Sequence, residues 1–335
     1  MRRRQFLGTL GAALATGAFA RRTPAQTAGE SATEERLADG PRSNAPRLPM
    51  REYGKTGIKL SIIGFPGFAM RDTTHNDRDR TNRLVAETIE RGVNFFDLAA
   101  QYGNAEEVMG PALQPYRRQV FVSSKTAKRT AEEAAKELDC SLERLKTDYL
   151  DAYNLHHIQH MDKDVDVAFG KGGAMELLIQ AKKEGRVRHL GFSAHSIEAA
   201  FAALDRYDFD SAIFPINYPS AMKGKWGPQI IERCQAKGVA MFALKALARQ
   251  QWPQDDPRRS SYPICWYQPI TDLDEAELGL RYTLSQPIVA ALPPSSDRLH
   301  RLAMILAMDH RPITPEEEQR LAALAEGLDP VFSQA

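Results

Sequence analysis

Residues 120–155 read VFVSSKTAKRTAEEAAKELDCSLERLKTDYLDAYNL, and this stretch decides the fold. Two short apolar runs, 120–124 and 149–155, flank a segment whose apolar residues recur at intervals of three and four. That segment begins with Thr130 and Glu133, the spacing of a capping box at the start of a helix. The stretch therefore predicts a strand, a helix and a second strand, with the strands buried and parallel.

The same alternation continues through the chain from residue 58. Further strands are predicted at 61–65, 94–98, 187–192, 211–216, 239–244 and 288–292, with helical patterns between them. Eight such repeats predict a (β/α)8 TIM barrel, with a β-hairpin before it and an extra helix starting near the capping box of Thr314 and Glu317. The alternative is a doubly wound open sheet, but the first strand leads into GFPGFAM and not into a GxGxxG phosphate loop.

Composition and charge are those of a globular protein. Of 335 residues 43% are hydrophobic and 26% charged, and the formal net charge is +1. There is no basic stripe to indicate nucleic-acid binding and no 18-residue apolar run to indicate a membrane span. Cys140, Cys234 and Cys265 lack the spacing of a disulfide framework or a metal site, and the histidines show no metal-ligand spacing either. We expect Cys140 and Cys234 in the core and Cys265 in an exposed loop.

The N-terminus reads MRRRQFLGTLGAALATGAFA, an arginine cluster followed by a short apolar run and small residues. Arg3-Arg4-Gln5-Phe6-Leu7 resembles a twin-arginine export signal, which predicts a periplasmic protein that the twin-arginine machinery exports. The alternative is a frayed basic tail. We assign 1–26 to the signal, 27–47 to a disordered linker rich in polar residues and proline, and 48–335 to the barrel.

Polar residues stand where the predicted strands end. Barrel enzymes carry their chemistry at the carboxyl ends of the strands and in the loops that follow. These positions hold Asp97 with Tyr102 shortly after it, Lys125, His156 and His157, Ser193 and His195, Asn217, and Lys245. Because parallel strands end at one mouth of the barrel, we expect these side chains to gather there.

Five motifs resemble those of the aldo-keto reductase family, in its order and spacing over about residues 50–330. They are REYGKTGIKLSIIGFPG (51–67), FFDLAAQYGNAEEVMG (95–110), VFVSSK (120–125), DYLDAYNLHH (148–157) and VRHLGFSAHS (187–196). Tyr53, Pro66 and Leu98 depart from the usual pattern. SYPICWYQP (261–269) is similar to a bacterial subgroup that often carries export signals.

The resemblance implies a catalytic tetrad of Asp97, Tyr102, Lys125 and His156. A free phenol has a pKa of about 10, and a nearby ammonium is expected to lower it, while a buried carboxylate keeps the ammonium charged. Tyr102 would donate a proton to a carbonyl oxygen while hydride reaches the carbon, and His156 would orient the carbonyl. Strand alternation turns only one of His156 and His157 into the barrel, and the family pattern favours His156.

The resemblance also implies a nicotinamide cofactor, NADP(H) in preference to NAD(H). Ser193 stands in the strand-5 motif that holds the carboxamide, and Asn217 either supplies a missing amide or stabilises a turn. Lys245 replaces an aromatic residue that stacks on nicotinamide in many relatives. Ser295 is kept from the phosphate motif, His300 replaces its usual Arg or Gln, and Arg298 with Arg301 either meets a 2′-phosphate or is solvated.

The loop 246–273 is long for a compact domain, which is typical of a functional loop. Its aromatic residues either wall an apolar substrate pocket or pack on the barrel: Trp252, Tyr262, Trp266 and Tyr267. The sequence as a whole predicts an NAD(P)H-dependent oxidoreductase that reduces a small aldehyde or ketone without a metal. The alternative is an exported nucleotide-binding sensor or interaction module on a reductase scaffold.

Overall fold

The stretch that decides the fold forms the strand–helix–strand unit that its pattern predicts. In the computed structural model, which describes residues 47–72 and 77–334, β5 (Phe121–Thr126) leads to α4 (Ala131–Leu145) and then to β6 (Leu150–Ile158). The hydroxyl oxygen of Thr130 accepts a hydrogen bond from the backbone N–H of Glu133 and caps α4. β5 and β6 pair in parallel, with Ser123 opposite Ala152.

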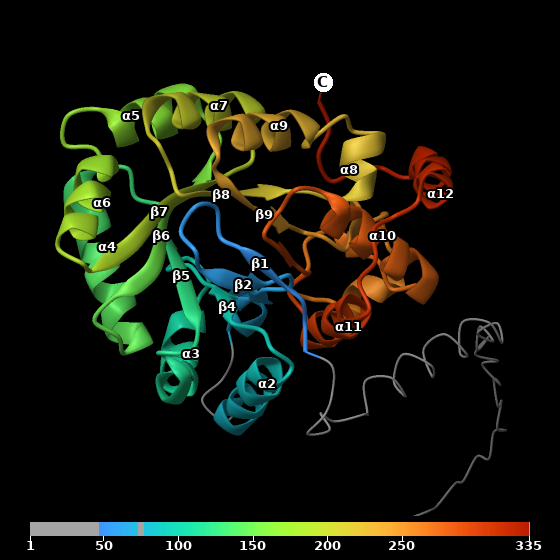
Figure 1. Cartoon of the computed structure of the whole chain (residues 1–335), viewed down its shortest axis with the longest axis horizontal. Coiled ribbons are helices and arrows are strands. Elements are labelled where there is room, and N and C mark those ends of the chain that lie inside the picture. The colour runs from blue at the N-terminus through green and yellow to red at the C-terminus, as the bar shows by residue number, and fades with distance from the viewer. Residues whose placement is uncertain (1–46, 73–76, 335) are drawn as a thin grey trace, which may run out of the picture.

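Eight parallel strands form the barrel, as predicted (Figure 1). In chain order they are β3 (Phe65–Pro66), β4 (Phe95–Asp97), β5, β6, β7 (Val187–Ala194), β8 (Ser211–Pro215), β9 (Ala240–Leu244) and β12 (Ala290–Leu292). β12 pairs with β9, and its other side meets the start of the sheet. The N–H of Ala291 donates to the carbonyl of Ile62 at 2.8 Å, and the N–H of Gly64 donates to the carbonyl of Ala291 at 3.0 Å. These contacts close the barrel.

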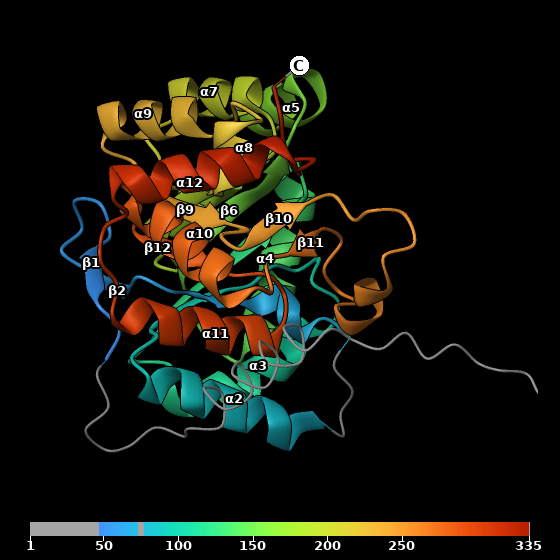
Figure 2. The same ribbon diagram turned by 90° about the vertical axis from the view of Figure 1, so that its right-hand side faces the viewer.

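Helices surround the strands, with one or two after each strand (Figure 2). They are α2 (Arg78–Glu90), α3 (Ala105–Leu113), α4, α5 (Asp166–Phe169), α6 (Ala174–Lys183), α7 (Ile197–Arg206), α8 (Tyr218–Met222), α9 (Pro228–Lys237), α10 (Leu273–Ser285) and α11 (Asp297–Met308). The extra C-terminal helix is α12 (Pro315–Glu326), and both hydrogen bonds of its predicted capping box are present between Thr314 and Glu317. The main apolar core lies between strands and helices.

The predicted N-terminal hairpin closes one end of the barrel. It consists of β1 (Met50–Glu52) and β2 (Lys59–Ser61), which pair antiparallel. Tyr53, in its turn, is fully buried against the rings of Phe121 and Phe242 and donates a hydrogen bond to Ser211 Oγ at 3.0 Å. This tyrosine, a departure from the family pattern, therefore fills the barrel floor.

The long loop after β9 lies at the other end of the barrel (Figure 2). It contains β10 (Ala248–Gln250) paired with β11 (Gln268–Pro269). Cys265 in this loop is buried, and Cys140 on α4 is exposed, so both of those sequence expectations are wrong. The Cys265 side chain is buried, with its Sγ 3.7 Å from the carbonyl oxygen of Ser295, whereas Cys140 lies on the exposed face of α4. Only Cys234 lies in the core as expected.

The predicted signal, 1–26, and nearly all of the predicted linker, 27–47, lie outside the described residues. Within the described part of the chain, no helix is both long enough and apolar enough to cross a membrane.

Candidate active site

A buried ion pair forms the centre of the barrel mouth. Asp97 is the last residue of β4, and Lys125 lies near the end of the neighbouring strand β5. Lys125 Nζ donates to Asp97 Oδ2 at 2.7 Å and to the carbonyl of Leu98 at 2.7 Å, with both charged side chains at most 3% exposed. Burial lowers the pKa of Lys125, but the Asp97 carboxylate and the Tyr102 oxygen raise it by more, so the ammonium stays charged.

The Tyr102 side chain contacts this pair through Lys125. Its hydroxyl oxygen accepts from Lys125 Nζ at 3.4 Å, and its ring lies edge-on to Phe68. Burial raises the pKa of Tyr102 above its ordinary value, and the Lys125 ammonium offsets only part of that rise. The expected lowering of the Tyr102 pKa is therefore wrong in direction, because the effect of burial outweighs that of the Lys125 ammonium. Tyr102 keeps its proton at neutral pH.

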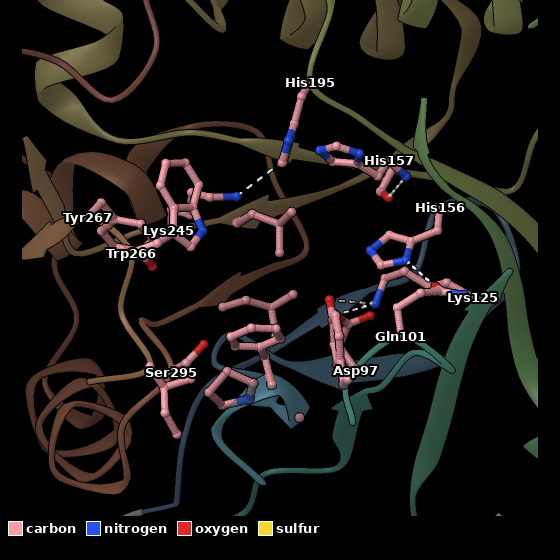
Figure 3. Close-up of a pocket in the computed structure, with 18 of the residues that line it drawn as sticks. Asp97, Gln101, Lys125, His156, His157, His195, Lys245, Trp266, Tyr267 and Ser295 are labelled. Atoms are coloured by element: carbon pink, nitrogen blue, oxygen red, sulfur yellow. Dashed lines mark hydrogen bonds and ion pairs between the residues drawn. The ribbon is translucent and has the colours of Figure 1, made fainter. Parts of the chain in front are cut away.

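His156 completes the predicted group of four on the next strand, β6. Its ring lies 5.6 Å from the Tyr102 ring, centre to centre, and its Nδ1 lies 2.7 Å from Gln101 Oε1. Burial, together with the cationic Lys125, lowers the pKa of His156 well below its ordinary value, so the imidazole is neutral at neutral pH. Asp97, Tyr102, Lys125 and His156 thus line one cavity. Figure 3 shows Asp97, Lys125 and His156 on the same side of it.

His157 lines the same cavity, which the sequence analysis did not expect. Its backbone is left-handed, with φ of 56°, and the pairing of β6 with β7 is irregular between Leu155 and Ile158. This kink breaks the alternation of side chains, so His156 and His157 both face the mouth. The N–H of His157 donates to Ser193 Oγ at 2.8 Å, which fixes the kink.

The opposite wall of the cavity carries a second lysine (Figure 3). Lys245 directly follows β9 and has a left-handed backbone, with φ of 59°, and its Nζ lies 3.2 Å from His195 Nε2. The ammonium also lies over the rings of Trp266 and Phe332, 5.5 and 5.4 Å from their centres. Among the described residues no carboxylate pairs with it, and burial lowers its pKa to about 7.

Four of the five residues predicted to bind the cofactor line this cavity or the groove beside it. Ser193, Lys245 and Ser295 line the cavity of about 520 Å³. Arg298 lines an adjoining groove of about 570 Å³, which shares Ile264 and Ser295 with the cavity. The two hollows are therefore continuous.

Asn217 is the exception and lies outside the lining of both hollows. Its Oδ1 accepts from the N–H of Ser220 and caps α8, while its Nδ2 donates to the carbonyl of Lys245 at 3.3 Å. The structure thus corresponds to the turn-stabilising alternative for this residue.

The start of α11 shows which residues of the phosphate motif face the groove. His300 is buried against Phe65 and lies 3.2 Å from Thr88 Oγ1, so its imidazole belongs to the core. Arg301 pairs with Glu87 at 2.8 Å. Arg298 has no ion-pair partner among the described residues. It is therefore the arginine of this helix that remains available for an anion.

The aromatic residues of the long loop divide between the two roles expected for them. Trp266 and Tyr267 line the cavity, and Tyr262 lines the groove. Trp252 donates to the carbonyl of Cys265 at 2.7 Å and holds the loop together. Phe332, in the segment after α12, also lines the cavity. Sequence reasoning missed it because nothing local distinguishes a terminal phenylalanine.

One side of the cavity thus carries a proton donor, Tyr102, together with the neutral imidazole of His156 and the ammonium of Lys125. Within the described residues no group of three or more His, Cys, Asp or Glu side chains is arranged to hold a metal ion. The arrangement provides a protonated phenol for a substrate oxygen, without a nucleophile activated by a neighbouring base.

Comparison with known proteins agrees with this geometry. Residues 62–262, more than half of the chain, match the Aldo/keto reductase family. The chain belongs to the aldo-keto reductase family. As a member of this family it is an oxidoreductase.

Relatives in the family cover most of this aldo-keto reductase. L-galactose dehydrogenase of Arabidopsis thaliana is 30% identical over 284 residues, which are 80% of this chain and 82% of the plant protein. An uncharacterized oxidoreductase of Bacillus subtilis, YqkF, is 24% identical and covers 81% of this chain and 94% of its own.

Solved structures of aldo-keto reductases share the fold. The holo form of an enzyme from Bacillus halodurans superposes with a TM-score of 0.66 at 23% identity, over 85% of this chain and 99% of that chain. An enzyme from Klebsiella pneumoniae in complex with NADPH gives 0.63 at 20% identity, over 87% and 98%.

Proposed function

We propose that this aldo-keto reductase reduces an aldehyde or ketone with NAD(P)H and that Tyr102 is the general acid. The observation that carries the proposal is the contact of Lys125 with both Asp97 and Tyr102 in a cavity open to a ligand. Lys125 donates to the phenol oxygen, so the phenol proton points to another acceptor. A carbonyl oxygen in the cavity is such an acceptor.

The chain's own residues would act as follows. Tyr102 donates its proton to the carbonyl oxygen, and the Lys125 ammonium stabilises the phenolate that remains. Asp97 keeps that ammonium charged and in place. His156 forms the wall beside the phenol, and Trp266 and Tyr267 exclude water from the far side of the cavity. A bound NAD(P)H supplies hydride to the carbonyl carbon.

The groove beside the cavity fits a phosphorylated nucleotide. α11 begins at Asp297 without a side-chain cap on Ser296, so the first N–H groups of this helix are available to an anion. We assign the nucleotide to Ser193 and Lys245 in the cavity and to Ser295 and Arg298 in the groove. Asp297 is paired with Arg80 and does not offset Arg298. We therefore propose NADP(H) as the preferred cofactor, because its additional phosphate suits Arg298. The NADPH complex of the Klebsiella enzyme supports this choice.

Substitution of Tyr102 by phenylalanine tests the mechanism. We expect Tyr102→Phe to lower kcat for carbonyl reduction by about 10²–10⁴-fold, the contribution of a general acid, and to leave NADPH affinity nearly unchanged. Tyr207→Phe, which removes a phenol that does not line the cavity, is the control. Reduction by Tyr102→Phe at the rate of the unmodified enzyme would exclude the mechanism.

Fluorescence titration tests the cofactor assignment. Arg298→Ala should weaken NADPH binding by about tenfold or more and NADH binding much less, because a charged hydrogen bond to the phosphate is lost. Arg83→Ala, an exposed arginine of α2, is the control. Equal losses for both nucleotides would show that Arg298 does not contact the phosphate.

We propose that residues 1–26 export this enzyme to the periplasm by the twin-arginine route, ahead of a linker at 27–47. The support is the order of arginines, apolar run and small residues in the sequence. Cell fractionation tests the proposal, since replacing Arg3 and Arg4 by lysine should retain the protein in the cytoplasm. An unchanged distribution would count against the route.

A further inference from the structure

Two lysines line the cavity, and only one of them has a counter-ion. Lys125 donates to the Asp97 carboxylate at 2.7 Å, whereas no carboxylate among the described residues pairs with Lys245. The two lysine side chains approach the cavity from opposite walls (Figure 3). Lys245 has no part in the proposed proton transfer, so its own chemistry is a separate question.

The acidic groups of the cavity do not compensate a charge on Lys245. Asp97 is the one carboxylate among the described residues that line the cavity, and Lys125 already pairs with it. Burial raises the pKa values of the phenols and the thiol in the lining, so these groups stay neutral: Tyr102, Tyr267 and Cys265. An ammonium at Lys245 is therefore buried without a partner of opposite charge, which is unfavourable.

The remaining neighbours of Lys245 are aromatic, neutral or cationic. The rings of Trp266 and Phe332 lie 5.5 and 5.4 Å from Nζ, and they attract an ammonium less strongly than the water that burial removes. The nearby histidines carry no charge at neutral pH, because burial lowers the pKa of each: His156, His157 and His195. Burial and the charge of Lys125 together lower the pKa of Lys245 to about 7, so about half of its side chains are neutral amines at that pH.

The hydrogen bonding of Lys245 leaves its lone pair available to the cavity. His195 Nε2 lies 3.2 Å from Nζ, and the neutral imidazole can accept an N–H from either the ammonium or the amine. Among the described residues, Nζ has no other hydrogen-bond partner. The neutral amine can therefore keep one N–H on His195 and turn its lone pair toward a ligand, and no base has to remove a proton first.

We propose that the Lys245 amine forms an imine with small aldehydes that enter the cavity when no nucleotide fills it, and that Lys125 does not. Nζ attacks the aldehyde carbon with its lone pair, and one amine hydrogen moves to the carbonyl oxygen to give a carbinolamine. The second amine hydrogen departs with the hydroxyl as water, and a C=N double bond remains. No oxidant or reductant is consumed, and hydrolysis reverses the reaction. This modification site does not depend on the proposed carbonyl reduction.

Reductive trapping tests the site. Sodium cyanoborohydride reduces an imine to a stable secondary amine, so propanal with this reductant leaves a propyl group on each lysine that forms an imine. The reaction is run at pH 7 on purified enzyme without added nucleotide, and peptide mass spectrometry follows each lysine. Lys171, which is exposed, is the surface reference, and Lys125 is the control inside the cavity. We expect Lys245 to be labelled about ten- to a hundredfold faster than Lys171, because an ordinary lysine is neutral to less than about 0.1% at pH 7. Lys125 should stay unlabelled.

A matched pair of substitutions at Trp266 tests why Lys245 reacts. The Trp266 side chain is 49% exposed and its ring faces Nζ, so polar residues are tolerated there and lie near the amine. Trp266→Glu supplies the missing carboxylate, which raises the pKa of Lys245 and holds it as an ammonium. Trp266→Gln makes the same change of shape without the charge. We expect labelling of Lys245 at pH 7 to be about tenfold or more slower in Trp266→Glu than in Trp266→Gln, with Lys171 unchanged.

The pH profile of labelling gives a readout that access to the cavity alone would not change. The rate at Lys245 should level off above about pH 8, whereas the rate at an exposed lysine should still rise at about pH 9. Labelling of Lys245 no faster than that of Lys171, or equal labelling in Trp266→Glu and Trp266→Gln, would overturn the inference. If the enzyme reduces no carbonyl compound with either nucleotide, the proposed function fails instead, and the labelling result still stands.

Discussion

The Asp97–Lys125 pair provides the most direct test of the site's energetics. Its two side chains are 3% and 1% exposed, and its atoms are 2.7 Å apart. Removing one member of a buried pair leaves an uncompensated charge, which costs about 3–5 kcal/mol of unfolding free energy. Asp97→Asn and Lys125→Met should each lose about this amount.

The double variant separates coupling from the loss of each group. Removing both charges leaves no uncompensated ion, although the carbonyl of Leu98 loses the hydrogen bond from Lys125 at a cost of about 1–3 kcal/mol. We therefore expect the double variant to be destabilised by no more than about 4 kcal/mol, well below the sum of the single losses.

Urea unfolding, followed by tryptophan fluorescence and far-ultraviolet circular dichroism, measures these differences by linear extrapolation. The same cycle at Glu132 and Lys136, which are 80% and 72% exposed, is the control and should show no measurable coupling. Additivity at Asp97 and Lys125 within about 0.5 kcal/mol would refute the reasoning, since it would mean that neither charge depends on the other.

Three further predictions follow from burial and close packing. Gly110→Ala should destabilise the fold by about 3 kcal/mol in urea, because its Cβ would lie 2.1 Å from the backbone oxygen of Arg144; an unchanged unfolding midpoint would contradict this. Lys245→Met should raise the free energy of unfolding by roughly 2–4 kcal/mol at pH 6, and the gain should shrink between pH 7 and 10. In that range the unfolded chain binds the Lys245 proton that the native chain has released, so the unmodified protein gains stability as the pH rises; a gain independent of pH would be evidence against a depressed pKa. For carbonyl reduction at saturating NADPH, the fall in kcat/KM that reports ionisation of Tyr102 should lie above the ordinary phenol value of about pH 10, because burial raises the pKa of Tyr102; a midpoint near pH 8 would contradict that direction.

The fold could be predicted from the sequence almost completely. Each of the eight predicted strands overlaps an observed one, because short apolar runs between amphipathic helices have few other ways to be buried. The shared position of Asp97, Tyr102, Lys125 and His156 also follows, since parallel strands must end at one mouth. The strand ends agree less well: the first barrel strand is predicted at 61–65, whereas β3 has only the two residues Phe65–Pro66.

What the sequence did not predict depends on burial or on a local backbone departure. His157 faces the cavity because of one left-handed residue, which no alternation pattern reveals. The pKa of Tyr102 rises because distant segments bury it. Gln101 contacts both His156 and Glu137 of α4, and the second contact depends on the packing of α4, which the local sequence does not show.

Ser193, near the end of β7, and Asn217, shortly after β8, have a structural role that their hydrogen bonds explain. His157 and Lys245 both adopt left-handed backbones at strand ends, a conformation that costs a non-glycine residue of order 1 kcal/mol and persists only where neighbours hold it. Ser193 accepts from the backbone N–H of His157, and Asn217 donates to the backbone carbonyl of Lys245. Each of these two polar side chains therefore holds the backbone of one strained cavity residue. A short polar side chain at a strand end can thus determine what the cavity presents by fixing a neighbour's backbone.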